Sequence, residues 1–349
     1  MINPIPHLIF IAIAWLVFAL IGERRPALIL TLFGIGYLSI YAPVALAWIA
    51  LTAIEASILV LFLKDKDRGS DLRQYLPYVL LLNLLFVDLH PEILLISVET
   101  LAISFSTIRI FMTAKQLLAM RSGFAARELK WIAAAAFYLP ALLVGPVFSG
   151  MELRKQAEAD ARPEVTARTF RFLLTGMVCV LLINPFIHLV ASEMTPPRNF
   201  MNLGPEGAPL LFGMLFAGFY GQSLVAEYTS RLFGRTLPHN FDRPWRAANI
   251  RDFWQRWHRS MANFVMQYIF LPMNMRGASA QLATISAFVF MGLWHNLSAG
   301  YFIWGLAHGC LLAFWPKKVE SKAGKMVERI VTWVAVIGLS YVANYSWLA

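Results

Sequence analysis

Three histidines towards the C-terminal end of the sequence are the side chains best suited to acid–base chemistry. They are His258 in RDFWQRWHRS, His295 in FMGLWHN and His308 in WGLAHG. An imidazole titrates near neutral pH and so can take a proton from an attacking hydroxyl group. Ionisable groups in apolar segments are costly to bury and often mark a functional site. We therefore treat these three residues as candidates for the catalysis of group transfer to an alcohol.

The other histidines have simpler interpretations. A membrane histidine often only hydrogen-bonds a neighbouring helix, and this is our interpretation of His7, His90 and His188, which lie in or beside apolar runs without a surrounding motif. His239 lies in a polar loop and is expected to be solvated. The three candidate histidines have neither close i,i+4 spacing nor a carboxylate partner, and we therefore predict no metal site.

The sequence before His258 predicts a short amphipathic helix. Asp252 and Arg256 are four residues apart and are expected to pair on one helix face. Trp254, Trp257 and His258 are expected to form an aromatic wall on the adjoining face. Such a helix suits a membrane interface, and an aromatic anchor without a catalytic role is the alternative interpretation.

The elements that position these residues are predicted to be membrane helices. The sequence has 349 residues, of which 58% are hydrophobic and 14% charged, and its mean hydropathy is +0.60. This is too apolar for an average soluble protein. Roughly 20 apolar residues cross a bilayer as a helix, and several runs approach or exceed that length. We predict an all-α, polytopic integral membrane protein with one domain over residues 1–349.

The charges and cysteines fit this class. The net charge is +10, but the basic residues lie in short breaks between apolar runs, a pattern that indicates cytoplasmic loops rather than nucleic-acid binding. Cys179 and Cys310 lie inside apolar runs, where a thiol packs as a small hydrophobe. The first apolar run has no basic residues before it, and Glu23-Arg24-Arg25 follows it, so we expect a retained helix rather than a cleaved signal peptide.

Two apolar runs are predicted to be broken or re-entrant. The run at 131–149 has basic segments on both sides and contains Pro140 and the Gly145-Pro146 pair. The run at 262–273 is too short to span and contains Pro272. If both return to the side they entered from, every basic break lies on the cytoplasmic side. Irregular backbone at membrane depth must be buried in protein or line a wet cavity, so an internal chamber is one interpretation and a bundle of kinked helices is the other.

Two segments around the candidate histidines resemble a known family. The segment TLPHNFDRPWRAANIRDFWQRWHRSMANFVMQYIFLPM at 236–273, followed by FMGLWHNLSAGYFIWGLAHG at 290–309, closely resembles the membrane-bound O-acyltransferase family. The resemblance is to its bacterial branch, which includes alginate O-acetyltransferases and teichoic-acid D-alanyltransferases. ISFSTIRIF at 103–111 and YLPALLVGPVFSG at 138–150 are weaker similarities. Residues of about 100–315 carry the resemblance.

The resemblance implies a fold and a set of site residues. The family fold is a ring of tilted helices around a tunnel, and with the apolar runs of this sequence it predicts about ten to twelve tilted transmembrane and re-entrant helices around a central tunnel. His295 resembles the family's catalytic histidine, and His258 resembles its second conserved polar position. Asn296 stands where these relatives usually have Gly, which brings the local turn and the acceptor specificity into question. The further candidates for lining the tunnel or substrate site are Asn296, Trp294, Trp257, Asp252, Arg256 and His308.

The expected reaction moves an acyl group, with acetyl as our first choice, from a cytoplasmic thioester to hydroxyls of an extracytoplasmic polysaccharide or relay protein. The donor would be acetyl-CoA or a phosphopantetheinyl acyl-carrier protein, and the arginines of 231–259 would suit its phosphates. We expect no permanently bound cofactor. The expected partners are membrane lipid, the donor and an extracytoplasmic acyltransferase or polymer-export protein, with the chain in the bacterial inner membrane.

Other functions stay open at this point. D-alanyl transfer to teichoic acid from a carrier protein is the alternative within the family. A transporter or flippase for a polymer precursor would use the broken helices as gates, but it would not explain the RWH and LWH elements. An inactive scaffold in an export complex is a third interpretation.

Overall fold

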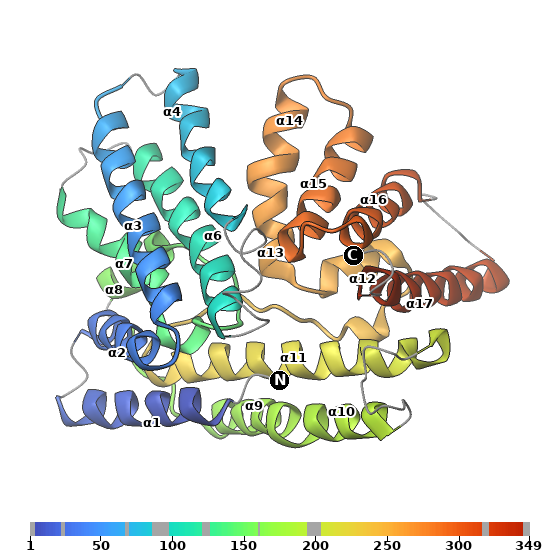
Figure 1. The fold of residues 1–349 in the computed structure, drawn as a ribbon, viewed down its shortest axis with the longest axis horizontal. Helices are drawn as coiled ribbons and strands as arrows, with labels where there is room; N and C mark the ends of the chain where they lie inside the picture. The colour runs from blue at the N-terminus through green and yellow to red at the C-terminus, as the bar shows by residue number, and fades with distance from the viewer. Residues whose placement is uncertain are drawn as a thin grey trace. The chain divides into compact units, whose positions relative to one another are not determined.

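The described part of the protein is helical and contains no β-strand (Figure 1). The computed structural model describes residues 4–21, 25–66, 70–85, 98–120, 126–159, 161–193, 204–315 and 321–344. Contacts divide the chain into two compact units, residues 1–176 with 222–238, and residues 177–221 with 239–349. His90 lies outside the described residues. The single domain over 1–349 stays a prediction.

Four helices are long and apolar enough to cross a membrane. Their apolar side chains also point outward: Leu174 is 62% exposed and Phe186 is 65% exposed, which is the pattern of a lipid-facing surface. Four shorter apolar helices accompany them within the described residues. A helical multi-pass membrane protein is the class that these features indicate, while the count of about ten to twelve segments and the tunnel stay predictions. The four long segments are Pro43–Leu63, Ala167–Val190, Pro205–Leu232 and Lys322–Ala343.

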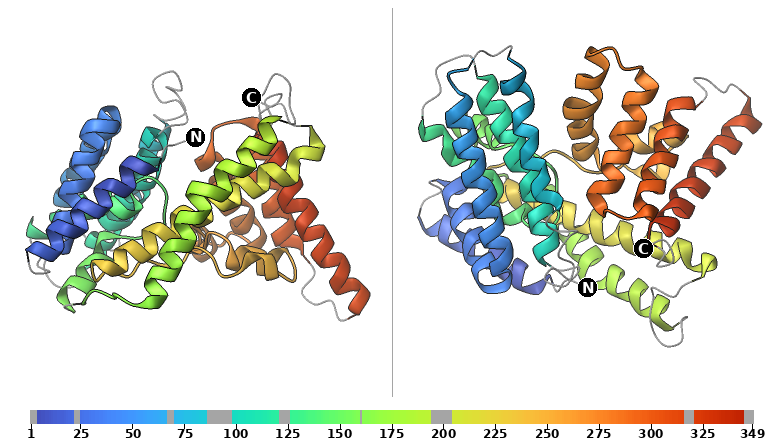
Figure 2. Two further views of the ribbon diagram at one scale, coloured as in Figure 1. Left: turned by 90° about the horizontal axis from the view of Figure 1, so that it is seen from below. Right: turned by 45° about the horizontal axis from the view of Figure 1, so that its top comes forward.

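The first unit contains the helices of the N-terminal half. In this unit α3 packs along α6, and the two run side by side in Figure 1 and in the right panel of Figure 2. Its elements are α1 (Ile5–Leu20), α2 (Pro26–Tyr41), α3 (Pro43–Leu63), α4 (Asp71–Tyr75), η1 (Leu76–Leu84), α6 (Val98–Ala119), η2 (Ala126–Leu129), α7 (Lys130–Ala136), η3 (Leu139–Ala141), α8 (Gly150–Glu158), most of α9 (Ala167–Val178) and the end of α11 (Ala208–Leu232).

The apolar run at 131–149 is broken, as the sequence predicts. Helix α7 ends at Ala136 and the chain stays irregular, apart from the single turn η3, until α8 begins at Gly150. Pro140 lies in η3, and proline removes a backbone donor that a continuing helix would need. This segment is almost completely buried in the unit, as required for irregular backbone in an apolar surrounding. Its return to the cytoplasmic side stays a prediction.

One face of α6 supplies the hydrogen-bond partners of the broken segment. Ser106 Oγ donates to the carbonyl of Ala136 at 2.7 Å, and the Arg109 guanidinium donates to the carbonyl of Ala141. Thr113 and Gln116 continue the same face at i+7 and i+10 from Ser106. They accept hydrogen bonds from the backbone amide of Gly150 at 2.8 Å and from the hydroxyl of Ser149 at 2.7 Å, respectively. Buried backbone groups that no helix satisfies are therefore paired by side chains of α6.

The second unit contains the three candidate histidines. Helices α15 and α16 form a closely packed hairpin in it, and α16 also packs against α17 (Figures 1 and 2). The elements are η4 (Cys179–Ile183), α10 (Asn184–Glu193), η6 (Pro205–Gly207), the first part of α11, η7 (Pro244–Arg246), α12 (Ile250–Arg256), α13 (Arg259–Val265), η8 (Met266–Phe270), α14 (Leu271–Met275), α15 (Ala280–His295), α16 (Ala299–Phe314) and α17 (Lys322–Asn344).

Two local features of this unit position the site. The short run at 262–273 is not one regular α-helix, because a π-helical turn, η8, separates α13 from α14.

Glycines set the contact between α15 and α16. A Cβ on Gly292 would lie 2.2 Å from the carbonyl oxygen of Tyr301, and a Cβ on Gly305 would lie 2.5 Å from the carbonyl oxygen of Phe288. Only glycine permits backbones to approach this closely.

Candidate functional site

His258 lies at a sharp corner between α12 and α13. Its φ of 42° and ψ of 50° place it in the left-handed region, which residues other than glycine adopt uncommonly. Asn240, which is fully buried, holds the corner: its carbonyl accepts from the Arg259 amide at 3.0 Å, and its side-chain oxygen accepts from Ser260 Oγ at 2.5 Å. A strained conformation that surrounding contacts maintain is typical of a functional position.

His258 and His295 come together around Trp294. The Trp294 ring lies 4.8 Å from the His295 ring and 6.0 Å from the His258 ring, measured between centroids. Trp294 therefore contacts both imidazoles. His258 is buried, with its ring 4.6 Å from that of Phe219, whereas His295 is exposed at the end of α15. The pair therefore combines one enclosed imidazole with one that is open to a substrate.

His308 lies one aromatic ring away from His295. The Trp304 ring lies 5.8 Å from His295 and 4.9 Å from His308, so it separates the two imidazoles. His308 is 1% exposed, and Trp254 packs against it at 5.1 Å. Within the described part of the chain, His308 Nδ1 has no hydrogen-bond partner. The structure thus places His308 in the aromatic surroundings of His295 rather than beside it.

Asn296 has an ordinary backbone conformation. It follows α15 with a φ of −169° and a ψ of 141°, which is extended backbone that any residue adopts. Its amide donates to the carbonyl of Gly292 at 3.3 Å. The asparagine therefore does not strain the local turn, and its exposed side chain is free to contribute to the surface next to His295.

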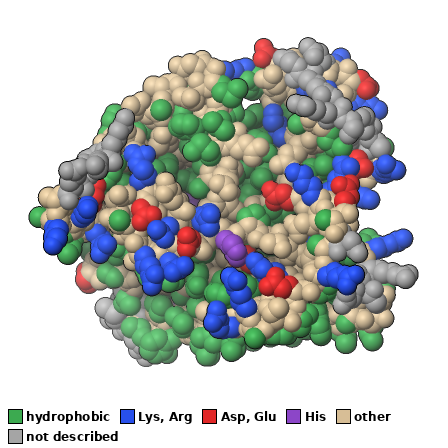
Figure 3. Space-filling view, turned by 180° about the vertical axis from the view of Figure 1, so that it is seen from behind, with side chains coloured by type: hydrophobic (Ala, Val, Ile, Leu, Met, Phe, Trp, Pro, Cys, Tyr) green, Lys and Arg blue, Asp and Glu red, His purple; other side chains and the backbone are tan. Residues whose placement is uncertain are grey.

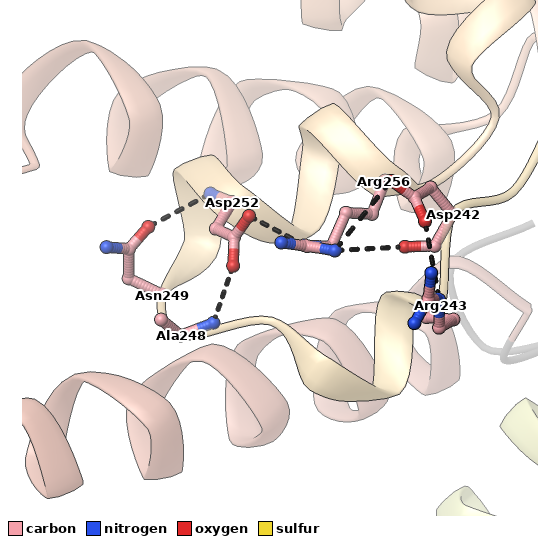
Figure 4. Close-up of polar contacts among 6 residues, drawn as sticks. All are labelled: Asp242, Arg243, Ala248, Asn249, Asp252 and Arg256. Carbon is pink, nitrogen blue, oxygen red and sulfur yellow. Dashed lines mark hydrogen bonds and ion pairs between the residues drawn. The ribbon is translucent and has the colours of Figure 1, made fainter.

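Asp252 and Arg256 form the predicted pair, at a distance of 2.7 Å from Arg256 Nε to Asp252 Oδ1 (Figure 4). Asp252 Oδ2 also accepts from the Ala248 amide at 2.9 Å, and Arg256 Nη1 donates to the Asp242 carbonyl at 3.2 Å. Asn249 caps the start of α12 through the Asp252 amide. The pair therefore holds residues 242–249 against α12.

The predicted aromatic wall of Trp254, Trp257 and His258 is wrong as a single helix face. Helix α12 ends at Arg256, and Trp257 and His258 follow it in non-helical conformations. Trp254 packs with His308, whereas the Trp257 ring lies 5.6 Å from Phe216 and 5.1 Å from Phe241. Because the helix ends between them, Trp254 and Trp257 contact different neighbours.

Several site residues carried no recognisable signal in the sequence. Phe219 and Asn240 contact the His258 corner from α11 and from the following loop, where neither lies in a spacing pattern with a histidine. Trp304 could have been found, because it lies four residues before His308 on one helix face. Tyr301, whose ring lies 5.6 Å from that of His295, precedes Trp304 by three residues.

His7 and His239 follow their simple interpretations. His7 is buried and lies 2.7 Å from the Leu139 carbonyl through Nε2, which confirms a hydrogen-bonded core histidine. His239 is exposed, as predicted for a polar loop. Within the described residues, no three His, Cys, Asp or Glu side chains come together in a cluster that would hold a metal ion.

The site borders an exposed basic segment. Arg243 and Arg246 are exposed between α11 and α12, and Arg251 is exposed at the start of α12. Figure 3 shows one face of the molecule on which Lys and Arg side chains are numerous beside apolar patches. An exposed imidazole, a buried imidazole and nearby cations are the groups needed to remove a proton from a hydroxyl and to bind an anionic reactant.

Comparison with known proteins places this arrangement in a family. Residues 26–322 match the family described as "MBOAT, membrane-bound O-acyltransferase family". This range contains the three candidate histidines and the broken segment of the first unit.

Curated relatives match about half of the chain. A peptidoglycan O-acetyltransferase of Helicobacter pylori is 26% identical over 50% of this chain and 35% of its own length. A teichoic acid D-alanyltransferase of Streptococcus thermophilus is 24% identical over 55% of this chain and 50% of its own length. The protein named "Probable alginate O-acetylase AlgI" of Pseudomonas syringae is 28% identical over 54% of this chain and 38% of its own length. The matches thus span half or less of these relatives.

Proposed function

Because the chain belongs to the membrane-bound O-acyltransferase family, we propose that it transfers an acyl group from a cytoplasmic thioester to a hydroxyl of an extracytoplasmic polymer or relay protein. Acetyl is our first choice, since relatives named for O-acetyl transfer to peptidoglycan and alginate match about half of the chain. The donor is acetyl-CoA or a phosphopantetheinyl acyl-carrier protein, and the chain lies in the bacterial inner membrane. An extracytoplasmic acyltransferase or polymer-export protein is the expected partner.

The observation that carries this proposal is the exposed imidazole of His295 beside the buried His258. His295 is the general base that removes the proton from the acceptor hydroxyl. The hydroxyl oxygen forms a bond to the acyl carbon, the carbon–sulfur bond breaks, and the proton passes from His295 to the leaving thiolate. His258 or Asn296 stabilises the oxyanion of the tetrahedral intermediate.

D-alanyl transfer is the second candidate, and the teichoic acid D-alanyltransferase relative favours it. The two reactions share the chemistry at His295 and differ in the group that is added. Mass spectrometry of the cell-surface polymer therefore separates them directly, because it identifies the added group.

The test measures acyl incorporation into cell-surface polymer in cells that express the native chain or His295→Ala at equal membrane levels. His188→Ala is a matched control, because His188 lies on α10, a helix that carries none of the three candidate histidines. Loss of incorporation in His295→Ala alone supports the proposal. Unchanged incorporation in His295→Ala would overturn it and would favour a transporter or scaffold.

A further inference from the structure

We infer that the exposed ring of Trp245, with Arg243 and Arg246 on either side, binds the adenosine 3′,5′-bisphosphate end of coenzyme A. The inference rests on the proposed function and selects CoA over a carrier protein as the donor, because the phosphopantetheine of a carrier protein has no adenine. Its basis is the exposure, charge and connectivity of residues 242–249 in the second unit.

Trp245 is unusually open for a tryptophan. It is 51% exposed, and its two ring contacts within the described residues are both edge-on, with Phe216 at an interplanar angle of 74° and with Tyr220 at 86°. Neither neighbouring ring is stacked parallel to the indole, and about half of the Trp245 surface is open to a ligand. A purine base stacks well on an exposed indole, and this stacking does not require hydrogen bonds to the edges of the base.

The charges next to Trp245 suit phosphates. Arg243 has a side-chain exposure of 60%, and its Nε lies 3.7 Å from Asp242 Oδ1. The Arg246 side chain is exposed, and its guanidinium has no hydrogen bond or ion pair in the described part of the chain. Guanidinium groups bind phosphate oxygens through paired hydrogen bonds. The 3′-phosphate and the pyrophosphate of CoA are the anions that would occupy these groups while the adenine lies on Trp245.

The turn that presents Trp245 is held in place before any ligand arrives. Arg243 adopts a left-handed conformation with a φ of 48°, and the amides of Arg246 and Ala247 close the following turn through the carbonyls of Arg243 and Pro244. The Arg256 guanidinium donates a hydrogen bond to the backbone carbonyl of Asp242 (Figure 4). A preorganised turn loses little conformational freedom on binding, which favours affinity.

A continuous set of aromatic rings leads from Trp245 to the site. Trp245 contacts Phe216 at 6.1 Å, and Phe216 contacts Trp257 at 5.6 Å. Trp257 precedes His258 in the chain, and Phe219 contacts both residues. The exposed end of this aromatic set therefore suits the nucleotide, and its buried end lies where the acyl group must be delivered. An interfacial Trp–Arg anchor for anionic lipid is the competing explanation, but it gives no reason for this connection to His258.

The test uses the purified full-length protein and adenosine 3′,5′-bisphosphate as the probe, with binding measured by equilibrium dialysis. Trp245→Leu is expected to weaken binding by about 5- to 150-fold, the range for loss of one base–aromatic stack. Trp245→Phe should retain most of the affinity. Arg246→Gln should weaken binding at low salt, and the difference from the native protein should become smaller as salt is added. Trp15→Leu is the matched control, since Trp15 is 38% exposed on α1. All four variants must match the native thermal unfolding midpoint.

Kinetics with two donors complete the test. Trp245→Leu should raise the KM for acetyl-CoA and leave that for acetyl-4′-phosphopantetheine unchanged. Failure of the native protein to bind the probe, or equal binding by Trp245→Leu, would overturn the inference. Equal probe binding, combined with loss in Trp245→Leu of a thermal stabilisation that added phosphatidylglycerol gives the native protein in detergent, would assign Trp245 to the membrane interface instead. Probe binding without any acyl transfer would leave the nucleotide site standing and refute the proposed function, so the two failures are distinguishable.

Discussion

The backbone amide of Gly150 donates to Thr113 Oγ1 at 2.8 Å, and this hydrogen bond joins α8 to α6 at the end of the broken segment. Both residues are fully or almost fully buried, so water cannot replace the threonine hydroxyl. The same hydroxyl donates to the carbonyl of Arg109 at 2.7 Å. The Thr113 hydroxyl therefore hydrogen-bonds both the regular helix α6 and the end of the broken segment.

Thr113→Val keeps the shape of the side chain but leaves the Gly150 amide without this acceptor. We expect the substitution to destabilise the protein by about 1 to 3 kcal/mol, the cost of an unsatisfied buried donor. Thr175→Val is the control, because Thr175 is exposed on α9 and its hydroxyl only donates to the Arg171 carbonyl of its own helix. Thermal unfolding of the two variants in the same detergent measures the difference. Equal unfolding midpoints would contradict the role given to Thr113.

The broken segment shows how far the sequence alone predicts such a feature. Pro140 and the Gly145-Pro146 pair predict the interruption, because these residues oppose a regular helix. The polar face of α6 was not predicted, although ISFSTIRIF drew attention as a weak family similarity. Ser106 and Arg109 are separated from their acceptors by about thirty residues of sequence. Which carbonyl they reach depends on how two distant segments pack, and periodicity contains no such information.

The corner at His258 is a second feature that the sequence predicts only in part. The i,i+4 spacing of Asp252 and Arg256 correctly predicts their ion pair, because helix geometry alone brings such residues together. The end of the helix at Arg256 was not predicted, since QRWHRS contains no glycine or proline to stop it. Hydrogen bonds from Arg259 and Ser260 to Asn240 impose the break. Tertiary contacts of this kind override local helix propensity.

The close approach of α15 and α16 provides a test of packing beside the site. Gly292→Ala would place its Cβ 2.2 Å from the Tyr301 carbonyl oxygen, so the two helices must separate. We expect a loss of stability of about 1 to 3 kcal/mol, as for other overpacked contacts, and reduced acyl transfer because Tyr301 and His295 both lie at this contact. Thermal unfolding midpoints and polymer acylation at equal membrane levels are the measurements.

Gly338→Ala is the matched control for this experiment. Gly338 lies on α17, and an added Cβ there would meet no atom within 4 Å. Alanine should stabilise this helix by up to about 1 kcal/mol through its higher helix propensity. A lower unfolding midpoint for Gly338→Ala than for Gly292→Ala would show that the spacing between α15 and α16 does not depend on Gly292.

The Asp252–Arg256 pair should protect the turn that contains Trp245. Arg256→Gln removes the ion pair and the guanidinium contact with the Asp242 carbonyl. A loss of about 1 kcal/mol in the local closing free energy would increase trypsin cleavage after Arg246 about fivefold. Arg329→Gln, an exposed position on α17, is the control. Equal cleavage rates in the two variants would mean that other contacts hold residues 242–249.

Glu152 gives α8 a predictable pH dependence. Burial raises the pKa of its carboxyl above the usual range, although a hydrogen bond from the Ser149 backbone amide to the carboxylate and the charge of Lys155 oppose this shift. A raised pKa means that the folded protein binds the proton more tightly than the unfolded chain does. The resulting stabilisation is fully present below the ordinary pKa and is lost as the pH rises through the raised value.

Glu152→Gln should remove this dependence. The amide cannot ionise, so at neutral pH the variant avoids burying a charged carboxylate and should unfold at a temperature equal to or above that of the native protein. The advantage should disappear on acidification, when the native carboxyl is protonated. Thermal unfolding at a series of pH values from neutral to mildly acidic measures both effects, with Glu158→Gln, an exposed position at the end of α8, as the control. A constant difference between Glu152→Gln and the native protein across the series would show that Glu152 does not titrate differently on folding.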